Sequence, residues 1–256
     1  MVGGTMQSVN LNLISLNIWG GYIERPLLEY IEKNKDVDIF CFQEVYHKAP
    51  VKMSTDDKYP PLDIYDSIQK RLPEHVSYFQ PIKEIEGYGI AVFAKKQITV
   101  VESGSINVYY NQNYPGSGPS HSRDLQWLKC EMAGKYFYIL NFHGLWNGKG
   151  KTDSKDRIIQ SQKIKEFINS LEYPIVLCGD FNLRPDTESI NILKNGMRDL
   201  IKEYDIKSTR TLFYKKPEKF ADYIFISKDV SVNAFKVLEE DVSDHTPIFL
   251  SFSLLL

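Results

Sequence analysis

Short apolar segments that run into polar clusters recur along this chain and limit what it can fold into. The clearest is residues 175–178, which lead into Gly179-Asp180-Phe181-Asn182. Residues 38–42 lead into Gln43-Glu44, and Ser243-Asp244-His245 precedes a last apolar stretch. Apolar runs of this length are typical of buried β-strands. Carboxylate, amide and imidazole groups at strand ends are poor core material, but they suit a divalent cation and a phosphate.

The spacing of apolar residues predicts an α/β fold. Strands are predicted over residues 9–18, 38–42, 90–94, 98–101, 125–131, 135–142, 175–178, 221–226 and 247–254. Helices are predicted over residues 25–34, 62–72, 155–171 and 187–194, and residues 111–121 form a loop rich in proline and glycine. The strands are too many for one exposed sheet. We therefore expect a four-layer sandwich of two packed mixed β-sheets flanked by helices.

The chain shows no linker, low-complexity tract or internal repeat, which favours a single domain over residues 1–256. Within it, residues 1–8 are expected to be a disordered segment or a cloning remnant. At 43% hydrophobic and 25% charged residues, the composition is that of a globular protein. Cys41, Cys130 and Cys178 all lie beside apolar residues, and their odd number predicts buried, reduced thiols rather than disulfides or a zinc site.

No apolar stretch approaches the roughly 20 residues that cross a bilayer, and the N-terminus lacks the pattern of a secretory signal. We expect a cytoplasmic monomer without membrane insertion. The net charge of −2 and pI of about 6.2 argue against binding nucleic acid by bulk charge. Two basic clusters remain, residues 149–157 and residues 215–219. Each is either a local basic rim or, as such runs more often are, a solvated loop or helix face.

Asp180 and Asn182 are the first candidate catalytic residues. In an extended chain, residues two apart point the same way, so both side chains can face one site. The carboxylate can accept a proton from water while the amide fixes its orientation or contacts a phosphate oxygen. The alternative is a turn in which the aspartate only bonds its own backbone after a strand. The tetrapeptide alone does not decide between the two.

Asp222 opens the apolar run 221–226, where a carboxylate is costly unless it has a partner. His245 is the obvious partner, since a carboxylate fixes the tautomer of an imidazole and raises its basicity. A structural salt bridge at a sheet edge is the alternative. Glu44 offers a hard oxygen ligand that suits Mg²⁺ or Mn²⁺. Asn17 ends the first strand, and Asn141 and His143 share a face at the end of another.

Taken together, these motifs closely resemble the endonuclease/exonuclease/phosphatase superfamily of metal-dependent, deoxyribonuclease I-like phosphoesterases. The resemblance extends over residues 13–250, with its landmarks in order: Leu16-Asn17, Gln43-Glu44, Gly89-Ile90-Ala91-Val92, Ser122-Arg123, Asn141-Phe142-His143, Gly179-Asp180-Phe181-Asn182, Ala221-Asp222-Tyr223 and Ser243-Asp244-His245.

The resemblance implies a role for each landmark. It implies that Glu44 binds the catalytic metal, Mg²⁺ or Mn²⁺, with Asn17 and Asp244 close by. It also implies that Asp180 activates the attacking water, oriented by Asn182. His245, paired with Asp222, contacts the phosphate or moves a proton, and His143 stabilises the developing charge. Arg123 resembles an arginine that contacts substrate phosphate, and Asn141 is grouped with it as substrate-binding. Members of the superfamily differ over the number of metals and the identity of the base.

The sequence leaves three functions open. A nucleic-acid phosphodiester is the first expected substrate, because lysines flank the site and residues 111–120 can reach a backbone. A phosphatase or phospholipase-C-like hydrolase of a small or lipid phosphoester is second, and a non-catalytic binding module is third. His143 stands where abasic-site endonucleases usually carry tyrosine, which argues against that branch. The remaining histidines, His47, His75 and His121, are expected at the surface. Four aromatic residues are candidates for a substrate groove, although packing is their commoner use: Trp19, Tyr22, Tyr114 and Trp146.

Overall fold

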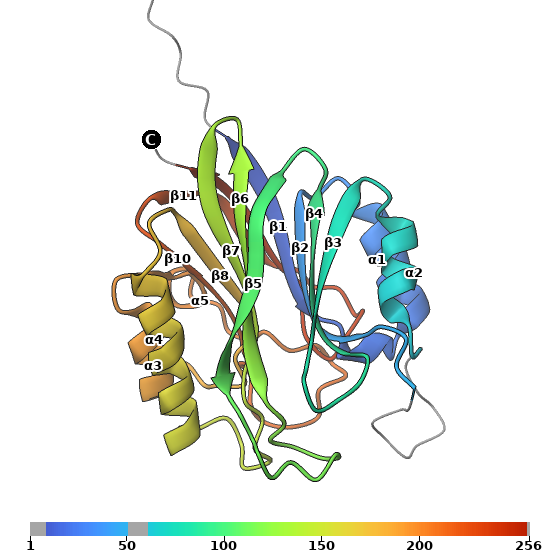
Figure 1. Cartoon of the computed structure of the whole chain (residues 1–256), viewed down its shortest axis with the longest axis vertical. Helices are drawn as coiled ribbons and strands as arrows, with labels where there is room; N and C mark the ends of the chain where they lie inside the picture. Colours follow the sequence, from blue (N-terminus) through green and yellow to red (C-terminus); the bar gives the residue numbers. More distant parts are fainter. Residues whose placement is uncertain (1–8, 51–60, 255–256) are drawn as a thin grey trace, which may run out of the picture.

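Two six-stranded mixed sheets form the centre of the molecule (Figure 1). The computed structural model describes residues 9–50 and 61–254. The first sheet has the order β11-β12-β1-β2-β4-β3. Its strands are β1 Asn10–Asn17, β2 Ile39–Tyr46, β3 His75–Pro81, β4 Tyr88–Lys95, β11 Val230–Val237 and β12 Ile248–Leu254. The second has the order β5-β6-β7-β8-β10-β9. Its strands are β5 Thr99–Tyr109, β6 Arg123–Met132, β7 Lys135–His143, β8 Ile175–Asp180, β9 Arg198–Asp199 and β10 Asp222–Ile226.

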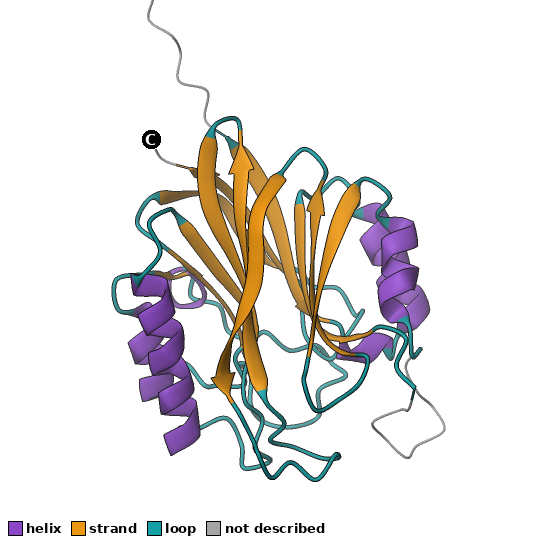
Figure 2. Ribbon diagram, viewed as in Figure 1, coloured by secondary structure: helices purple, strands orange, loops and turns teal. Residues whose placement is uncertain are grey.

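Helices cover the outer face of each sheet (Figure 2). Helices α1 Glu24–Lys33 and α2 Ile64–Arg71 pack on the first sheet, and α3 Lys155–Asn169 and α4 Glu188–Lys194 lie beside the second. The short helices η1 Trp19–Gly21 and α5 Leu200–Glu203 complete the set. Ser154 begins α3 by accepting a hydrogen bond from the Arg157 N–H, and Thr187 begins α4 in the same way. The expected four-layer sandwich is confirmed.

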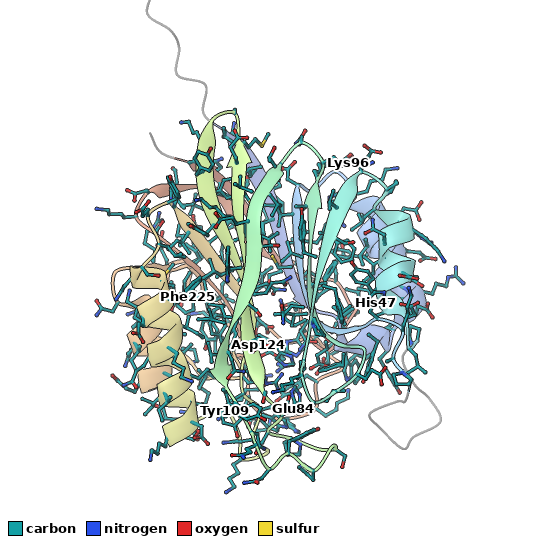
Figure 3. All side chains as sticks on the ribbon, viewed as in Figure 1. His47, Glu84, Lys96, Tyr109, Asp124 and Phe225 are labelled. Atoms are coloured by element: carbon teal, nitrogen blue, oxygen red, sulfur yellow. The ribbon has the colours of Figure 1, made fainter. Side chains whose placement is uncertain are left out.

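Alternation along β1 explains why the two sheets pack together. Leu11 and Leu13 point into the core between the sheets, whereas Ile14 and Leu16 point to the helices on the other face. The same split occurs in β2, where Cys41 faces the second sheet and Phe40 faces the helices. Both faces of the first sheet are therefore buried. Figure 3 shows side chains filling the space between the two sheets.

Two strands of the first sheet, β3 and β11, were not predicted. Both lie at its edges, and along β3 only His75 is buried. A strand at an edge buries few side chains, so its sequence carries little apolar pattern. Strand β5 also runs further than expected, to Tyr109, because it is mostly exposed along the edge of the second sheet.

The three cysteines are buried and unpaired, as predicted. The prediction that the remaining histidines lie at the surface was wrong for His75 and His121, which are buried. His75 packs against Phe40 and hydrogen-bonds to the Val37 carbonyl. These tertiary contacts bury the ring, and no local sequence motif indicates them. The expectation for residues 1–8 falls outside the described residues. Across the described ranges, no helix combines the length and apolar character needed to span a membrane.

Candidate active site

Strand pairing brings most of the candidate residues to one edge of the two sheets. β1 runs parallel to β2, and β7 runs parallel to β8, so their C-terminal ends lie together at the lower edge in Figure 1. In the second sheet His143 is the register partner of Asp180, and Asp180 is the partner of Asp222. Three adjacent strands thus present an imidazole and two carboxylates side by side.

The turn after β8 fixes Asp180. Gly179 has φ of 141°, and a Cβ added there would lie 1.9 Å from the Phe142 carbonyl oxygen, so only glycine allows β7 and β8 to approach this closely. The Asp180 Oδ1 then accepts a hydrogen bond of 2.8 Å from the backbone N–H of Asn182. The extended geometry predicted for residues 180–182 is therefore wrong, since Asn182 has φ of 55°. The two alternatives considered for this tetrapeptide are both present. Asp180 bonds its own backbone in a turn, and the side chains of Asp180 and Asn182 nevertheless line one cavity.

A bulge in β2 aims Glu44 at the same place. Regular alternation after Cys41 and Gln43 would put Glu44 on the helix side of the sheet. Instead the register with β4 shifts between Phe42 and Val45, and Glu44 has φ of 59°. The predicted end of the strand at Glu44 was wrong for this reason, because β2 continues through the bulge to Tyr46. The unusual backbone reverses the direction of one side chain.

Asn17 lies between the two carboxylates. Its Nδ2 donates to Glu44 Oε1 at 3.0 Å and to Asp180 Oδ2 at 3.0 Å, while its Oδ1 accepts from the Trp19 N–H at 2.9 Å. In this arrangement the amide oxygen is engaged by the backbone. Asn17 therefore links the two carboxylates through its Nδ2, and its predicted place beside the metal stays a prediction.

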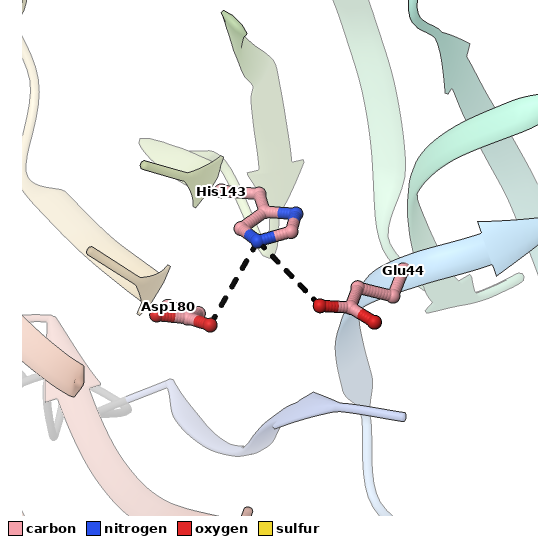
Figure 4. A group of neighbouring side chains, drawn as sticks. All are labelled: Glu44, His143 and Asp180. Atoms are coloured by element: carbon pink, nitrogen blue, oxygen red, sulfur yellow. Dashed lines mark ion pairs between the residues drawn. The ribbon is translucent and has the colours of Figure 1, made fainter. Parts of the chain in front are cut away.

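His143 completes a group that could hold a divalent cation (Figure 4). Its Nε2 lies 3.8 Å from Glu44 Oε1 and 3.8 Å from Asp180 Oδ2, and the three ligand atoms lie within 4.8 Å of one another. These separations are too long for hydrogen bonds and leave room for an ion. Burial raises the pKa of the Glu44 carboxyl, and the nearby charges of Asp244 and Asp180 raise it further. A cation relieves this repulsion, so the donor set fits Mg²⁺ or Mn²⁺.

The predicted Asp222–His245 pair forms on the other side of Asp180. His245 Nδ1 lies 2.8 Å from Asp222 Oδ1, and Asp222 Oδ2 accepts a hydrogen bond of 2.8 Å from the Thr209 hydroxyl. The opposite ring atom, Nε2, faces Asp180 Oδ2 at 3.5 Å. Burial and Arg210 lower the pKa of His245, but the carboxylates of Asp222, Asp244 and Asp180 outweigh them and raise it.

The surroundings also shift the pKa values of His143 and Asp180. Burial and the charge of Arg123 hold the pKa of His143 well below its usual value, so this imidazole is neutral. Burial alone would raise the pKa of Asp180, but the cationic groups around it, led by His245 and Lys151, hold it far below its usual value. Asp180 is therefore ionised at any physiological pH. A histidine with a lowered pKa, a carboxylate with a lowered pKa and a histidine with a raised pKa therefore lie together in one cavity.

Asn141 does not reach this cavity. It is fully buried between the sheets, where its Nδ2 donates to the carbonyls of Phe42 and Ala91, and its Oδ1 accepts from Gln43 Nε2 at 2.7 Å. The proposed contact with substrate is wrong for Asn141, because its polar atoms are already used to join the two sheets. Asn141 and His143 share a strand face, but only His143 lies at the end of the strand.

A cavity of about 460 Å³ lies above these groups. Arg123, predicted to contact phosphate, lines it, and its buried Nε and Nη1 have no hydrogen-bond partner in the described part of the chain. Trp19 and Trp146 also line it, as the aromatic groove predicts, whereas Tyr22 instead stacks on Trp19. Asp244 lines the cavity and pairs with Arg210 at 3.2 Å.

Five residues that line this cavity had no predicted role in a site: Tyr46, Tyr88, His121, Arg210 and Tyr214. Lys151 and Lys216 also line it, and both belong to the basic clusters that the sequence left open between a local rim and a solvated face. Lys151 was grouped with exposed neighbours, but it is 2% exposed and donates to Asn182 Oδ1 at 2.8 Å. Arg210 lies between two threonines without a motif. The sequence offers only a weak signal for Arg210, which is that it precedes Asp222 at the start of β10.

Comparison with known proteins agrees with this geometry. The chain matches the Endonuclease/Exonuclease/phosphatase family over residues 14–245. No curated protein matches it. Among solved structures, it is similar to a family protein from Bacteroides thetaiotaomicron, with 21% identity, TM-score 0.74 and coverage of 98% of this chain and 100% of the other.

Two further structures share the fold. A mannosyl-6-phosphatase from Bacteroides thetaiotaomicron has 20% identity and TM-score 0.71, with coverage of 94% of this chain and 99% of the other. TDP2 from D. rerio, complexed with a single-strand DNA product, has 18% identity and TM-score 0.72, with coverage of 95% and 98%. At these identities the likeness extends to the fold alone. The family match spans nearly the whole chain, so this chain belongs to the endonuclease/exonuclease/phosphatase family of phosphoesterases.

Proposed function

We propose that this protein is a divalent-metal-dependent phosphodiester hydrolase that acts on nucleic acid. The observation that supports this most directly is that the carboxylates of Glu44 and Asp180 meet beside His143, with the Asn17 amide donating to both. A bound Mg²⁺ or Mn²⁺ would supply Lewis-acid activation of the phosphate and of a coordinated water. Glu44 would hold it, with Asp244 alongside.

The remaining groups have complementary roles in hydrolysis. A water oxygen forms the new bond to phosphorus, and the bond from phosphorus to the ester oxygen breaks. Asp180 orients the water and receives its proton, and the Lys151 contact fixes Asn182 beside it. His245, held by Asp222, donates a proton towards the leaving oxygen or neutralises charge on the phosphate. His143 and Arg123 donate hydrogen bonds to the phosphate oxygens as negative charge develops on them.

The cavity favours a single-stranded or terminal phosphodiester over a duplex. It is walled by segments from both sheets and by the loops at residues 118–123, 146–151 and 210–216. A hollow of about 460 Å³ accepts one nucleotide-sized group around the reacting phosphate. The likeness to TDP2 complexed with a single-strand DNA product supports this choice.

A phosphatase or phospholipase-C-like hydrolase of a small or lipid phosphoester is the second candidate. The likeness to a mannosyl-6-phosphatase supports it, and the cavity is large enough for a sugar phosphate. A non-catalytic binding module is disfavoured, because the acid, imidazole and amide groups that hydrolysis needs are all assembled at one place.

A substrate panel tests the proposal. Wild-type protein and the Asp180→Asn variant are assayed in Mg²⁺ and in Mn²⁺ on plasmid, single-stranded oligonucleotide, abasic duplex, sphingomyelin and inositol phosphates. We expect turnover of the single-stranded oligonucleotide that needs the cation and is lost in the variant. Hydrolysis of only a small or lipid ester supports the second candidate. Cation-independent turnover, or none on any ester, contradicts the proposal.

A further inference from the structure

Two lysines and a tryptophan form one wall of the cavity, and the proposed hydrolysis gives none of them a direct contact with the scissile phosphate. Lys151 Nζ lies 5.7 Å from the centroid of the Trp146 ring, and Lys216 Nζ lies 4.9 Å from the same centroid. All three residues line the cavity. We call this group the lysine–tryptophan wall. Since both cations already lie over the indole ring, the wall presents positive charge to a ligand rather than a free aromatic face.

Lys151 is a buried cation whose side chain forms no salt bridge within the described residues, although the charge of Asp180 acts on it through space. It is 2% exposed, and its only hydrogen bond within the described residues is to the neutral Oδ1 of Asn182. The nearest charges that act on Lys151 are the carboxylates of the reacting site, Asp180, Asp222 and Asp244, and neither Lys151 nor Lys216 forms a salt bridge with them among the described residues. A buried ammonium is costly unless an anion accompanies it, and its other two N–H donors are available to a ligand in the cavity.

The part of the wall formed by Trp146 and Lys151 is held in place before any ligand binds, whereas Lys216 is exposed. Arg157, at the start of α3, is buried and donates to the carbonyls of Leu145, Gly150 and Thr152. The Lys151 carbonyl in turn accepts a hydrogen bond of 2.8 Å from the Arg184 N–H. The loop that carries Trp146 and Lys151 is thereby held from both sides. A positively charged site that needs no rearrangement loses little entropy on binding an anion.

Arg210 differs from the wall lysines because it is already paired. It contacts Asp244 at 3.2 Å and stacks on Tyr214, with Cζ 4.0 Å from the ring centroid. Its charge is therefore balanced within the site that holds the scissile phosphate. On this side of the cavity, the cations that have no carboxylate in direct contact among the described residues are Lys151 and Lys216.

We propose that the lysine–tryptophan wall binds a second phosphate of the substrate, next to the phosphate that reacts. The inference rests on the proposed phosphoesterase function and narrows its substrate class to phosphoesters with another phosphate close by. The neighbouring phosphate of a nucleic-acid strand meets this requirement, as does a bisphosphate of a sugar. A substrate with one phosphate leaves the wall empty.

Two thymidine esters with the same leaving group test the proposal. Thymidine 5′-(4-nitrophenyl phosphate) carries only the reacting phosphate, and its 3′-phosphorylated form carries a second one. We expect the 3′-phosphate to lower KM about tenfold, the value of a charged hydrogen bond of about 1.5 kcal/mol. The ratio of the two KM values should fall towards one in Lys151→Met and in Lys216→Met. It should stay unchanged in Lys149→Met, which removes an exposed lysine of the same loop.

Other outcomes contradict the proposal. A wild-type KM ratio of one, or equal losses on both esters in the Lys151 and Lys216 variants, means that the wall does not recognise a second phosphate. The same comparison of glucose 6-phosphate with glucose 1,6-bisphosphate shows whether the second phosphate must belong to a nucleotide.

If neither thymidine ester is hydrolysed, the proposal of a nucleic-acid phosphodiesterase fails, and the wall is tested by binding alone. Calorimetry then compares thymidine 3′,5′-bisphosphate with thymidine 5′-monophosphate. Tighter binding of the bisphosphate that is lost in Lys151→Met supports the wall as an anion site. Equal affinity for both nucleotides overturns it.

Discussion

His245 is held between carboxylates, and this makes its partnership with Asp222 measurable. Asp222 Oδ1 lies 2.8 Å from His245 Nδ1, so it acts on the reaction through that ring. We expect His245→Ala to lower kcat by roughly 10²–10⁴-fold, and Asp222→Asn to lower it less. The double variant should be little slower than His245→Ala alone, as measured by steady-state kinetics. Losses that multiply would show that the two residues act independently.

His121 gives a prediction about pH and stability. Burial, with the nearby charge of Arg123, lowers the pKa of His121 to about 2. In the unfolded chain a histidine titrates near pH 6.5 (about the model-peptide value), so the unfolded state binds more protons between these limits. Stability from neutral His121 is therefore complete above about pH 6.5. It is lost as pH falls, by up to about 1.4 kcal/mol per pH unit.

The His121→Gln variant tests this directly. Urea unfolding at several pH values between 4.5 and 6.5 should show a shallower dependence on pH in the variant than in the wild type, since one titrating group is removed (a slope difference of up to about 1.4 kcal/mol per pH unit). Equal slopes for the two proteins would mean that His121 is protonated in the folded state.

At the scale of one element, Arg157 determines the conformation of the loop between β7 and α3. It is 1% exposed and bonds three carbonyl oxygens of that loop. Arg157→Met leaves those carbonyls without a donor, so we expect it to reduce the free energy of unfolding by about 3 kcal/mol. Urea denaturation measures this, with the exposed Lys155→Met as control, for which we expect a change within about 0.5 kcal/mol. A stable Arg157→Met protein would show that the loop is held by other contacts.

Sequence reasoning succeeded where a residue's environment is set by its own strand. Residues 175–178 are apolar because β8 is buried on both faces, and the polar cluster marks the point where burial ends. It failed for residues whose environment depends on distant partners. Lys149 and Lys151 look equivalent in sequence, yet Lys151 is buried and donates a hydrogen bond to Asn182, which lies in the distant loop after β8.

The direction of Glu44 has the same origin. The bulge that turns it towards the site arises from the pairing of β2 with β4, whose sequence is far away in the chain. Regular alternation, the only local information available, indicated the opposite face. Arg210 was missed for a related reason, since its partners Asp244 and His245 lie more than 30 residues later, at separations of 34 and 35.

At the scale of the molecule, we predict one cooperative unit. A single apolar cluster includes residues from both sheets, among them Leu13 of β1, Leu140 of β7 and Leu177 of β8. Unfolding of either sheet would therefore expose the apolar core that it shares with the other. Scanning calorimetry should therefore show one transition whose calorimetric and van't Hoff enthalpies agree. Two resolved transitions would contradict the expectation of a single domain.

The central claim is that a divalent cation held at Glu44 enables hydrolysis of a phosphoester. The most direct test is the rate of hydrolysis of thymidine 5′-(4-nitrophenyl phosphate) as Mg²⁺ is added to metal-free protein, for the wild type and for Glu44→Gln. We predict no turnover without the cation and a saturating rise with it in the wild type. In Glu44→Gln, whose urea unfolding should match the wild type within about 1 kcal/mol, the rate should fall by at least about 100-fold or need far more Mg²⁺. Full turnover in metal-free protein, or the same Mg²⁺ dependence in both proteins, would contradict it.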